Sequence, residues 1–290
     1  AVDTDNLGEY NANFKRFQKH IKPGKEGFLK SAYSAYRERS LGLGAMGFHS
    51  YLQSRNLPFE GIYATGFNHK AFKYIKRQAT KASQRLADER GEAPDINGSG
   101  RRNAHLLAVA PNASSSIICG GTSPSIEPYR ANVYTHKTLS GSFQVKNRHL
   151  ENLLSDKKLT KKELEEVWKD IAGHEGSVQH LDILTDEEKE IFKTANEIDQ
   201  MWIVEHAAQR QDYICQAQSV NLFFTIPTAT EPQEVHDEYM QYVNDVHWYG
   251  MNKLKSLYYF RTNAARNAEN VNLKVQRIKL DEVECIACEG

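Results

Sequence analysis

The chain has 290 residues, 40% of them hydrophobic, and its acidic and basic side chains balance to a formal net charge of +0. This length allows one large domain with an adequate core, and the neutral charge gives no basis for binding nucleic acid or a membrane surface, so we expect neither. No apolar run reaches membrane-spanning length, the start lacks a signal-peptide pattern, and four cysteines do not make a disulfide framework, which together predict a cytoplasmic protein.

The first part of the chain is predicted to be mainly helical. Residues 1–26 are polar and mixed in type, and we expect them to form a polar N-terminal leader. Apolar side chains recur at roughly helical spacing over residues 28–52, which predicts a helix there. Glycines at positions 42, 44 and 47 would let this helix approach a neighbouring backbone closely. A second, basic helix is predicted over residues 69–92, ending near Gly91.

A short apolar run followed by a polar turn comes next. Residues 106–110 are short enough for a buried strand, and Pro111 stops it because proline cannot donate to a ladder. Small residues follow before the apolar pattern resumes in a new helix, whose first amides have no partner inside the helix and would suit an anion. The residues expected to hold a phosphate are Asn112, Ala113, Ser114, Ser115 and Ser116. The alternative is an ordinary turn capped by serine.

Beyond residue 130 the pattern alternates between strands and helices. We expect a hairpin around Ser140 and Gly141, followed over residues 149–193 by a charged helical region that forms a solvated surface insertion. The remaining predicted elements are a helix over 194–218, a buried strand over 219–226, a helix over 234–255 and a strand over 255–261. Strands that alternate with helices indicate a parallel sheet built from βα units, which is the α/β class.

The last predicted strand carries two adjacent tyrosines, Tyr258 and Tyr259. Neighbouring residues of a strand point to opposite faces, so the two rings are expected on opposite sides of the sheet. Filling the core is the ordinary role of aromatic residues in strands. A phenol also suits electron transfer, because loss of its electron can be coupled to loss of a proton whose pKa is about 10 in water.

The four cysteines fall into two groups. Cys119 and Cys215 are single and lie within predicted buried elements, so both are expected to be core residues. Cys285 and Cys288 form a CxxC pair in a polar segment, residues 263–290, that we expect to be an extended, flexible tail. A zinc site would need two further ligands at suitable spacing, so no metal site is predicted. A pair in such a tail suits thiol–disulfide exchange.

Four phrases of the sequence, in order, resemble the large subunit of class I ribonucleotide reductases. They are RERSLGLGAMGFHSYL at 37–52, RNAHLLAVAPNASSSIICGGTSPSIEPYR at 102–130, KSLYYFR at 255–261 and CIAC at 285–288. The resemblance, expected from about residue 31 and absent before about residue 25, implies the C-terminal half of a ten-stranded α/β barrel over residues 27–262. It implies that the 112–116 turn holds a substrate diphosphate and that Tyr258 and Tyr259 end a radical path. Cys285 and Cys288 would then re-reduce an active-site disulfide.

The resemblance also implies partners. The family's thiyl-forming cysteine phrase, N-x-C-x-E, has no match here, so a split large subunit is expected, with that cysteine on a separate N-terminal chain. Half a barrel would leave an open sheet edge and an exposed apolar face, so this chain is expected to need the other half as an obligate partner. The other implied partners are a small subunit with a metal–tyrosyl radical cofactor, thioredoxin or glutaredoxin as reductant, and a ribonucleoside diphosphate substrate. No cofactor is expected on this chain itself.

Two functions stay open at this point. The first is a part of ribonucleoside-diphosphate reductase, which converts ribonucleotides to deoxyribonucleotides by radical chemistry. The second is a non-catalytic nucleotide- or phosphate-binding module with a redox-sensing CxxC tail. The lack of the N-x-C-x-E phrase favours the second for the isolated chain. The tyrosine pair and the cysteine pair favour the first, because a phosphate binder needs neither.

Overall fold

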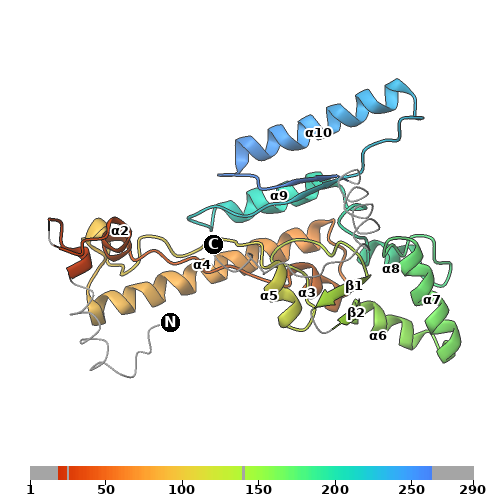
Figure 1. The fold of residues 1–290 in the computed structure, drawn as a ribbon, viewed down its shortest axis with the longest axis horizontal. Coiled ribbons are helices and arrows are strands. Elements are labelled where there is room, and N and C mark those ends of the chain that lie inside the picture. Colours follow the sequence, from red (N-terminus) through yellow and green to blue (C-terminus); the bar gives the residue numbers. More distant parts are fainter. Residues whose placement is uncertain (1–18, 25, 139–140, 263–290) are drawn as a thin grey trace, which may run out of the picture.

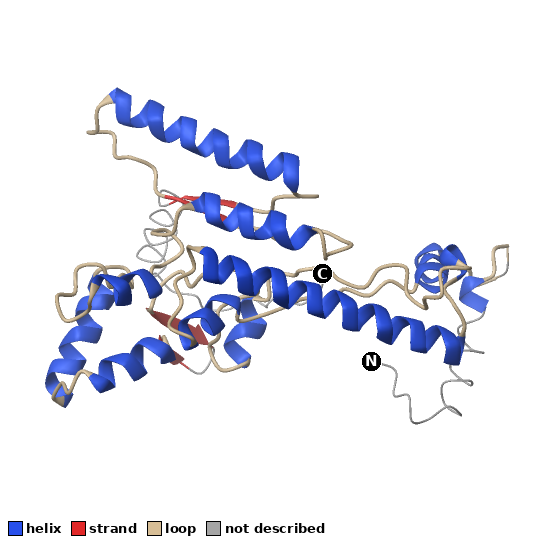
Figure 2. Ribbon diagram, turned by 180° about the vertical axis from the view of Figure 1, so that it is seen from behind, coloured by secondary structure: helices blue, strands red, loops and turns tan. Residues whose placement is uncertain are grey.

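The structure is a computed structural model of the chain, and it describes residues 19–24, 26–138 and 141–262. Most of the predicted leader and all of the predicted tail, including Cys285 and Cys288, lie outside these ranges. Within them, helices predominate and the regular strands are short (Figures 1 and 2). None of the described helices is long and apolar enough to cross a membrane.

The elements follow one another in an order close to the predicted one. The first half contains η1 (Lys19–Ile21), α2 (Lys30–Glu38), α3 (Phe48–Ser54), α4 (Ile62–Arg90), η2 (Pro94–Ile96) and α5 (Ala113–Ile118). The second half contains β1 (Val133–Thr138), β2 (Gly141–Lys146), α6 (Arg148–Asp156), α7 (Lys161–Gly173), α8 (Asp186–Ile191), α9 (Gln200–Gln211), β3 (Leu222–Phe224), α10 (Gln233–Lys253) and β4 (Phe260–Thr262). The antiparallel pairing of β1 with β2 confirms the predicted hairpin.

Four extended segments, residues 41–43, 105–109, 216–224 and 258–262, lie next to one another in parallel. Single parallel bridges join Leu43 to Leu107 and Val109 to Gln218. The third segment contains β3, which pairs in parallel with β4 in the fourth. The parallel arrangement predicted for an α/β protein is therefore confirmed. The regular strands are shorter than expected, because the first three segments are joined only by isolated bridges in the part of the chain that the structure describes.

The prediction of one helix over residues 28–52 is wrong in its middle. The chain leaves α2 at Arg39, whose φ is 50°, and enters α3 only at Phe48. Between them, the amides of Leu41 and Leu43 donate to carbonyls of the 105–106 backbone at 3.0 and 2.9 Å. A Cβ on Gly44 would lie 2.8 Å from the carbonyl oxygen of Ala108. The glycines do permit close approach, but of two extended backbones, which a helical side chain pattern cannot reveal.

The main core lies between the parallel segments and three long helices. Figure 1 shows α9 between α4 and α10, with β3 and β4 beside it, and Figure 2 shows the same order from behind. Side chains from α3, α4, α9, β3 and α10 meet in one cluster that includes Phe48, Phe72, Ala207, Leu222 and Val246. Burial of this apolar surface is what holds the short, irregular segments in place.

The charged region after β2 is helical as predicted, but it is more than a solvated surface insertion. Helices α6, α7 and α8 enclose a second core, in which Leu150, Leu154 and Ile171 are fully buried. Thr160 and Thr185 begin α7 and α8 with complete capping boxes, so the helix ends satisfy their own first amides. The charges that dominate the sequence lie on outward faces, and the fewer apolar residues turn inward.

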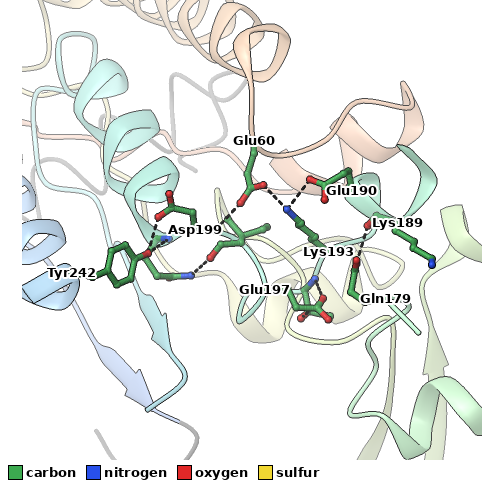
Figure 3. A network of polar contacts seen from close by, with 11 residues as sticks. Glu60, Gln179, Lys189, Glu190, Lys193, Glu197, Asp199 and Tyr242 are labelled. Carbon is green, nitrogen blue, oxygen red and sulfur yellow. Dashed lines mark hydrogen bonds and ion pairs between the residues drawn. The ribbon is translucent and has the colours of Figure 1, made fainter. Parts of the chain in front are cut away.

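A polar network joins this helical region to the rest of the molecule (Figure 3). Glu60, before α4, accepts hydrogen bonds from Lys193 Nζ at 2.8 Å and from the amide of Asp199 at 2.7 Å. Tyr242 of α10 donates to the Asp199 carboxylate at 2.7 Å and accepts from the amide of Gln200 at 2.7 Å. Burial opposes the charge on Lys193, but Glu190 and Glu60 outweigh it and raise the lysine's pKa. The network fixes where the chain passes from the second core to α9.

Candidate functional site

The predicted phosphate turn follows the central extended segment, as expected. Asn112 adopts the left-handed conformation at φ 52°, and α5 begins at the next residue. Its side chain makes no capping hydrogen bond, so an ordinary side-chain cap does not explain this turn. Ala113, Ser114 and Ser115 are exposed at the start of α5. The first amides of a helix have no acceptor within it, so they face outward here together with two serine hydroxyls.

Ser116 differs from its neighbours. It is buried, and its hydroxyl donates to the carbonyl oxygen of Ala113 at 2.8 Å. Its amide donates to the carbonyl of Asn112 at 3.0 Å. Both donors of Ser116 are therefore engaged within the turn, and the residue stabilises the turn instead of presenting a hydrogen bond to a ligand.

A cavity of about 180 Å³ opens beside this turn. Its lining residues are Gly42, Gly44, Ala45, Met46, Ala108, Ala110, Asn112 and Ser115. The lining is small and partly glycine because the first two extended segments approach each other closely at Gly44 and Ala108. The sequence identified the turn, whereas the contribution of residues 42–46 depends on the strand-like path that the sequence did not predict.

Tyr258 and Tyr259 immediately precede β4 and do not point to opposite faces, so that expectation is wrong. Their ring centroids lie 4.1 Å apart at an interplanar angle of 49°. Both residues are 49% exposed, so neither packs in the core formed by the described residues. A hydrogen bond with Tyr259 raises the pKa of the Tyr258 hydroxyl above its ordinary value. The pair thus forms a connected, solvent-accessible unit at the end of the sheet.

A buried carboxyl group connects to this pair through one side chain. Asn221 donates from Nδ2 to Glu127 at 2.5 Å and accepts the Tyr259 amide at 3.2 Å through Oδ1. Burial raises the pKa of Glu127 to about 7, although Arg130 and the Asn221 hydrogen bond oppose the shift. The Arg261 guanidinium lies 5.2 Å from the centre of the Tyr259 ring. Glu127 had no predicted role, although a carboxylate between Ile126 and Pro128 was a visible signal.

The two single cysteines have different environments, and Cys119 is not a core residue as expected. Cys119 is exposed just after α5. Cys215 is half-buried, and its sulfur accepts hydrogen bonds from the amides of Leu106 and Leu107 at 3.0 and 3.2 Å. Burial raises the pKa of the Cys215 thiol, but these amides outweigh it and the net shift is downward. Cys215 anchors the central segment.

Comparison with protein families gives a match over most of the chain. The family model described as "Ribonucleotide reductase, barrel domain" matches residues 12–99 and 93–260. The match begins before residue 25, so the resemblance extends further towards the N-terminus than the phrases indicated.

Individual relatives and a solved structure agree with this match. The chain is 44% identical to the ribonucleoside-diphosphate reductase large subunit of Invertebrate iridescent virus 3, with 90% of this chain and 40% of the relative covered. It is 43% identical to the putative large subunit of Frog virus 3, with 90% and 44% covered. The Actinobacillus ureae class Id ribonucleotide reductase alpha subunit superposes with a TM-score of 0.69 at 40% identity, covering 85% of this chain and 44% of that structure. The chain thus spans less than half the length of each.

Proposed function

This chain belongs to the ribonucleotide reductase barrel-domain family, and from that premise we propose that it works as part of a ribonucleoside-diphosphate reductase large subunit. One observation carries the proposal. The cavity-lining turn at Asn112 and the paired rings of Tyr258 and Tyr259 belong to one set of adjacent parallel segments. A substrate turn and a redox-active pair are the two parts that such an enzyme needs from this region.

The substrate of the proposed site is a ribonucleoside diphosphate. Its phosphates bind to the amides of Asn112, Ala113 and Ser114 and to the hydroxyls of Ser114 and Ser115. Ser116 keeps the turn in shape through its bond to the Ala113 carbonyl. The small residues of the 42–46 segment leave room for the remainder of the substrate.

Tyr258 and Tyr259 carry the radical in this proposal. One phenol loses an electron and its hydroxyl proton as its neighbour's radical gains both, so charge balances at each step. Contact between the rings and the hydrogen bond between the hydroxyls give the electron and the proton a short path. The metal–tyrosyl radical cofactor, held on a separate small subunit, supplies the oxidising equivalent.

The remaining proposed partners follow from the exposed edges and from the cysteine pair. The two outer segments expose apolar residues: Leu41 and Leu43 on the first, and Phe260 on the last. Such edges suit packing against the rest of a barrel, whichever polypeptide carries it. Cys285 and Cys288 would exchange disulfides with the active site and with thioredoxin or glutaredoxin. This chemistry calls for a reducing compartment, and we place the protein in the cytoplasm.

The non-catalytic alternative has lost its main support. The relatives are more than twice as long as the stretch matched here, so the lack of an N-x-C-x-E phrase carries no weight against catalysis. A phosphate-binding module would bind nucleotides through the Asn112 turn without any requirement for the hydroxyls of Tyr258 and Tyr259.

The test is removal of those hydroxyls in the assembled enzyme with its small subunit. Tyr259→Phe and Tyr258→Phe should each lower turnover by more than about 100-fold, equivalent to about 2.7 kcal/mol of barrier. Tyr74→Phe is the matched control, because Tyr74 is a similarly exposed tyrosine on α4, and it should retain full activity. All three variants should unfold like the unmodified protein. Full activity of Tyr259→Phe would exclude the radical role.

A further inference from the structure

A cluster of metal-ligating side chains lies at the end of α7, away from the proposed active site. We propose that Asp170, His174 and His180 bind one divalent transition-metal ion of the zinc class. Asp170 Oδ1 lies 3.1 Å from His174 Nδ1, and Asp170 Oδ2 lies 3.0 Å from His180 Nε2. The donor atoms all lie within 4.8 Å of one another, and no other group of three in the described part of the chain meets this criterion.

The spacing of the donor atoms matches what a metal ion requires. Zinc binds imidazole nitrogen and carboxylate oxygen at about 2.0–2.2 Å, which in a tetrahedron separates neighbouring donors by about 3.3 Å. Each imidazole nitrogen lies 3.0–3.1 Å from a different oxygen of Asp170, so a small adjustment of these side chains lets one carboxylate oxygen and both nitrogens surround an ion. The two imidazole rings stack with centroids 3.7 Å apart, so both rings lie on one side of the carboxylate.

The backbone holds these side chains in position before any ion binds. His174 caps α7, and its amide donates to the Asp170 carbonyl at 3.0 Å. Ile171 and Val178, which are fully buried, anchor the chain between the ligands in the second core. The turn between them is fixed by Gly176 at φ +86°, where a Cβ would clash with that of Ala131. Ligands on a rigid frame lose little freedom on binding.

The chemistry of the site favours a particular class of ion. Two imidazoles and one carboxylate suit zinc and its neighbours, whereas magnesium and calcium prefer oxygen ligands. Asp170 and His174 are exposed, which leaves access for the ion and room for water as a further ligand. The ion would join the end of α7 to the loop that carries His180, and so stabilise the helical region.

Binding of Co²⁺ and Zn²⁺ to the full chain tests the site. The measurements use a Cys285→Ser, Cys288→Ser background, because those thiols would bind the same ions. We expect one-to-one binding with the visible absorption of four-coordinate Co²⁺, and a rise in Tm with Zn²⁺ that a chelator reverses. His174→Asn, His180→Asn and Asp170→Asn should each weaken affinity at least about tenfold. His236→Asn, at a partly buried histidine of α10, is the control and should bind like the parent.

The competing explanation is a cluster held only by hydrogen bonds between Asp170 and the two histidines. Binding that does not saturate, or that survives in the triple variant of all three residues, overturns the metal site. The metal-free variants should show the circular dichroism of the parent, since the replaced side chains lie at the surface of the second core. Neither result depends on reductase activity, so this test is independent of the proposed function.

Discussion

The two cores of this protein differ in how completely they close. The helical region around Leu150 and Leu154 buries its apolar residues fully and caps its helices with its own side chains. The main core instead ends at sheet edges where Leu41, Leu43 and Phe260 are exposed. Helices satisfy their backbone hydrogen bonds internally, whereas a strand needs a neighbour on each side. A few helices can therefore finish a core that four parallel segments leave open.

The proposed chemistry belongs to the open part. The Asn112 turn and the tyrosine pair lie at the ends of the parallel segments, where the backbone changes direction and side chains remain accessible. The helical region contributes none of these groups and is joined to the open part through Glu60, Lys193 and Asp199. The fully enclosed helical core thus favours stability, and the accessible ends of the parallel segments favour ligand binding.

The largest effect should come from opening the second core. Leu154→Ala removes a fully buried side chain, and a loss of about 2–5 kcal/mol is expected for such a cavity. If the helical region is a unit of its own, hydrogen exchange should accelerate in α6 and α7 while amides of α4 and α9 stay protected. Leu52→Ala in the main core should give the reverse pattern. Equal acceleration everywhere would mean that the two cores unfold as one.

The buried Glu127 should make the open part sensitive to pH. Its pKa is raised from 4.5 to about 7, so the folded state holds a proton that the unfolded state releases. The contribution of Glu127 to the free energy of unfolding therefore falls as pH rises from 4.5 to 7. The fall is up to about 3 kcal/mol, at about 1.4 kcal/mol per pKa unit.

Glu127→Gln removes this dependence. The difference in unfolding free energy between variant and parent should grow in the variant's favour between pH 5 and pH 8, as measured by denaturant titration. Burial lowers the pKa of both His49 and His206 to about 3, which destabilises the fold as pH falls below their ordinary range. Both proteins share that effect, so it cancels in the difference. A difference that stays constant with pH would show that Glu127 is ionised in the folded state.

The phosphate turn should respond to loss of a single hydroxyl. Ser115→Ala should weaken binding of a ribonucleoside diphosphate by about 1–3 kcal/mol, the range for a hydrogen bond to a charged group. Ser155→Ala is the matched control in the closed region, because that hydroxyl donates only to the Glu151 carbonyl one turn earlier. Calorimetric titration of the assembled enzyme measures both. Unchanged affinity in Ser115→Ala would remove this residue from the substrate site.

The smallest effect should come from a helix cap in the closed part. Thr160→Ala removes the side chain that accepts the Glu163 amide at 3.3 Å, and a loss of about 1 kcal/mol is expected. Hydrogen exchange at the start of α7 should report it, with turnover of the assembled enzyme unchanged. Thr185→Ala should behave in the same way at α8, whose capping box has the same form. A loss of turnover in either variant would contradict the separation of the two parts.

Much of the architecture was predictable because its signals are local. Periodic apolar residues located α10 within two residues at each end, and α4 near its end, although its start lies seven residues earlier than predicted. Proline and small polar residues located the turn before α5, and alternating elements indicated the parallel α/β arrangement that the family match supports. The amino-acid sequence of residues 102–130 pointed to the ribonucleotide reductase family. The roles of Cys285 and Cys288 stay predictions.

Only the tertiary structure decided the features that depend on contacts between distant segments. The path through Gly44 is extended because the Ala108 backbone lies against it, and the rings of Tyr258 and Tyr259 meet because they precede the strand that pairs with β3. The link from Glu127 to Tyr259 through Asn221 spans most of the domain in sequence. Local patterns encode which face of an element is apolar, whereas partners across the fold are chosen by packing of the whole chain, and no window of neighbouring residues contains that information.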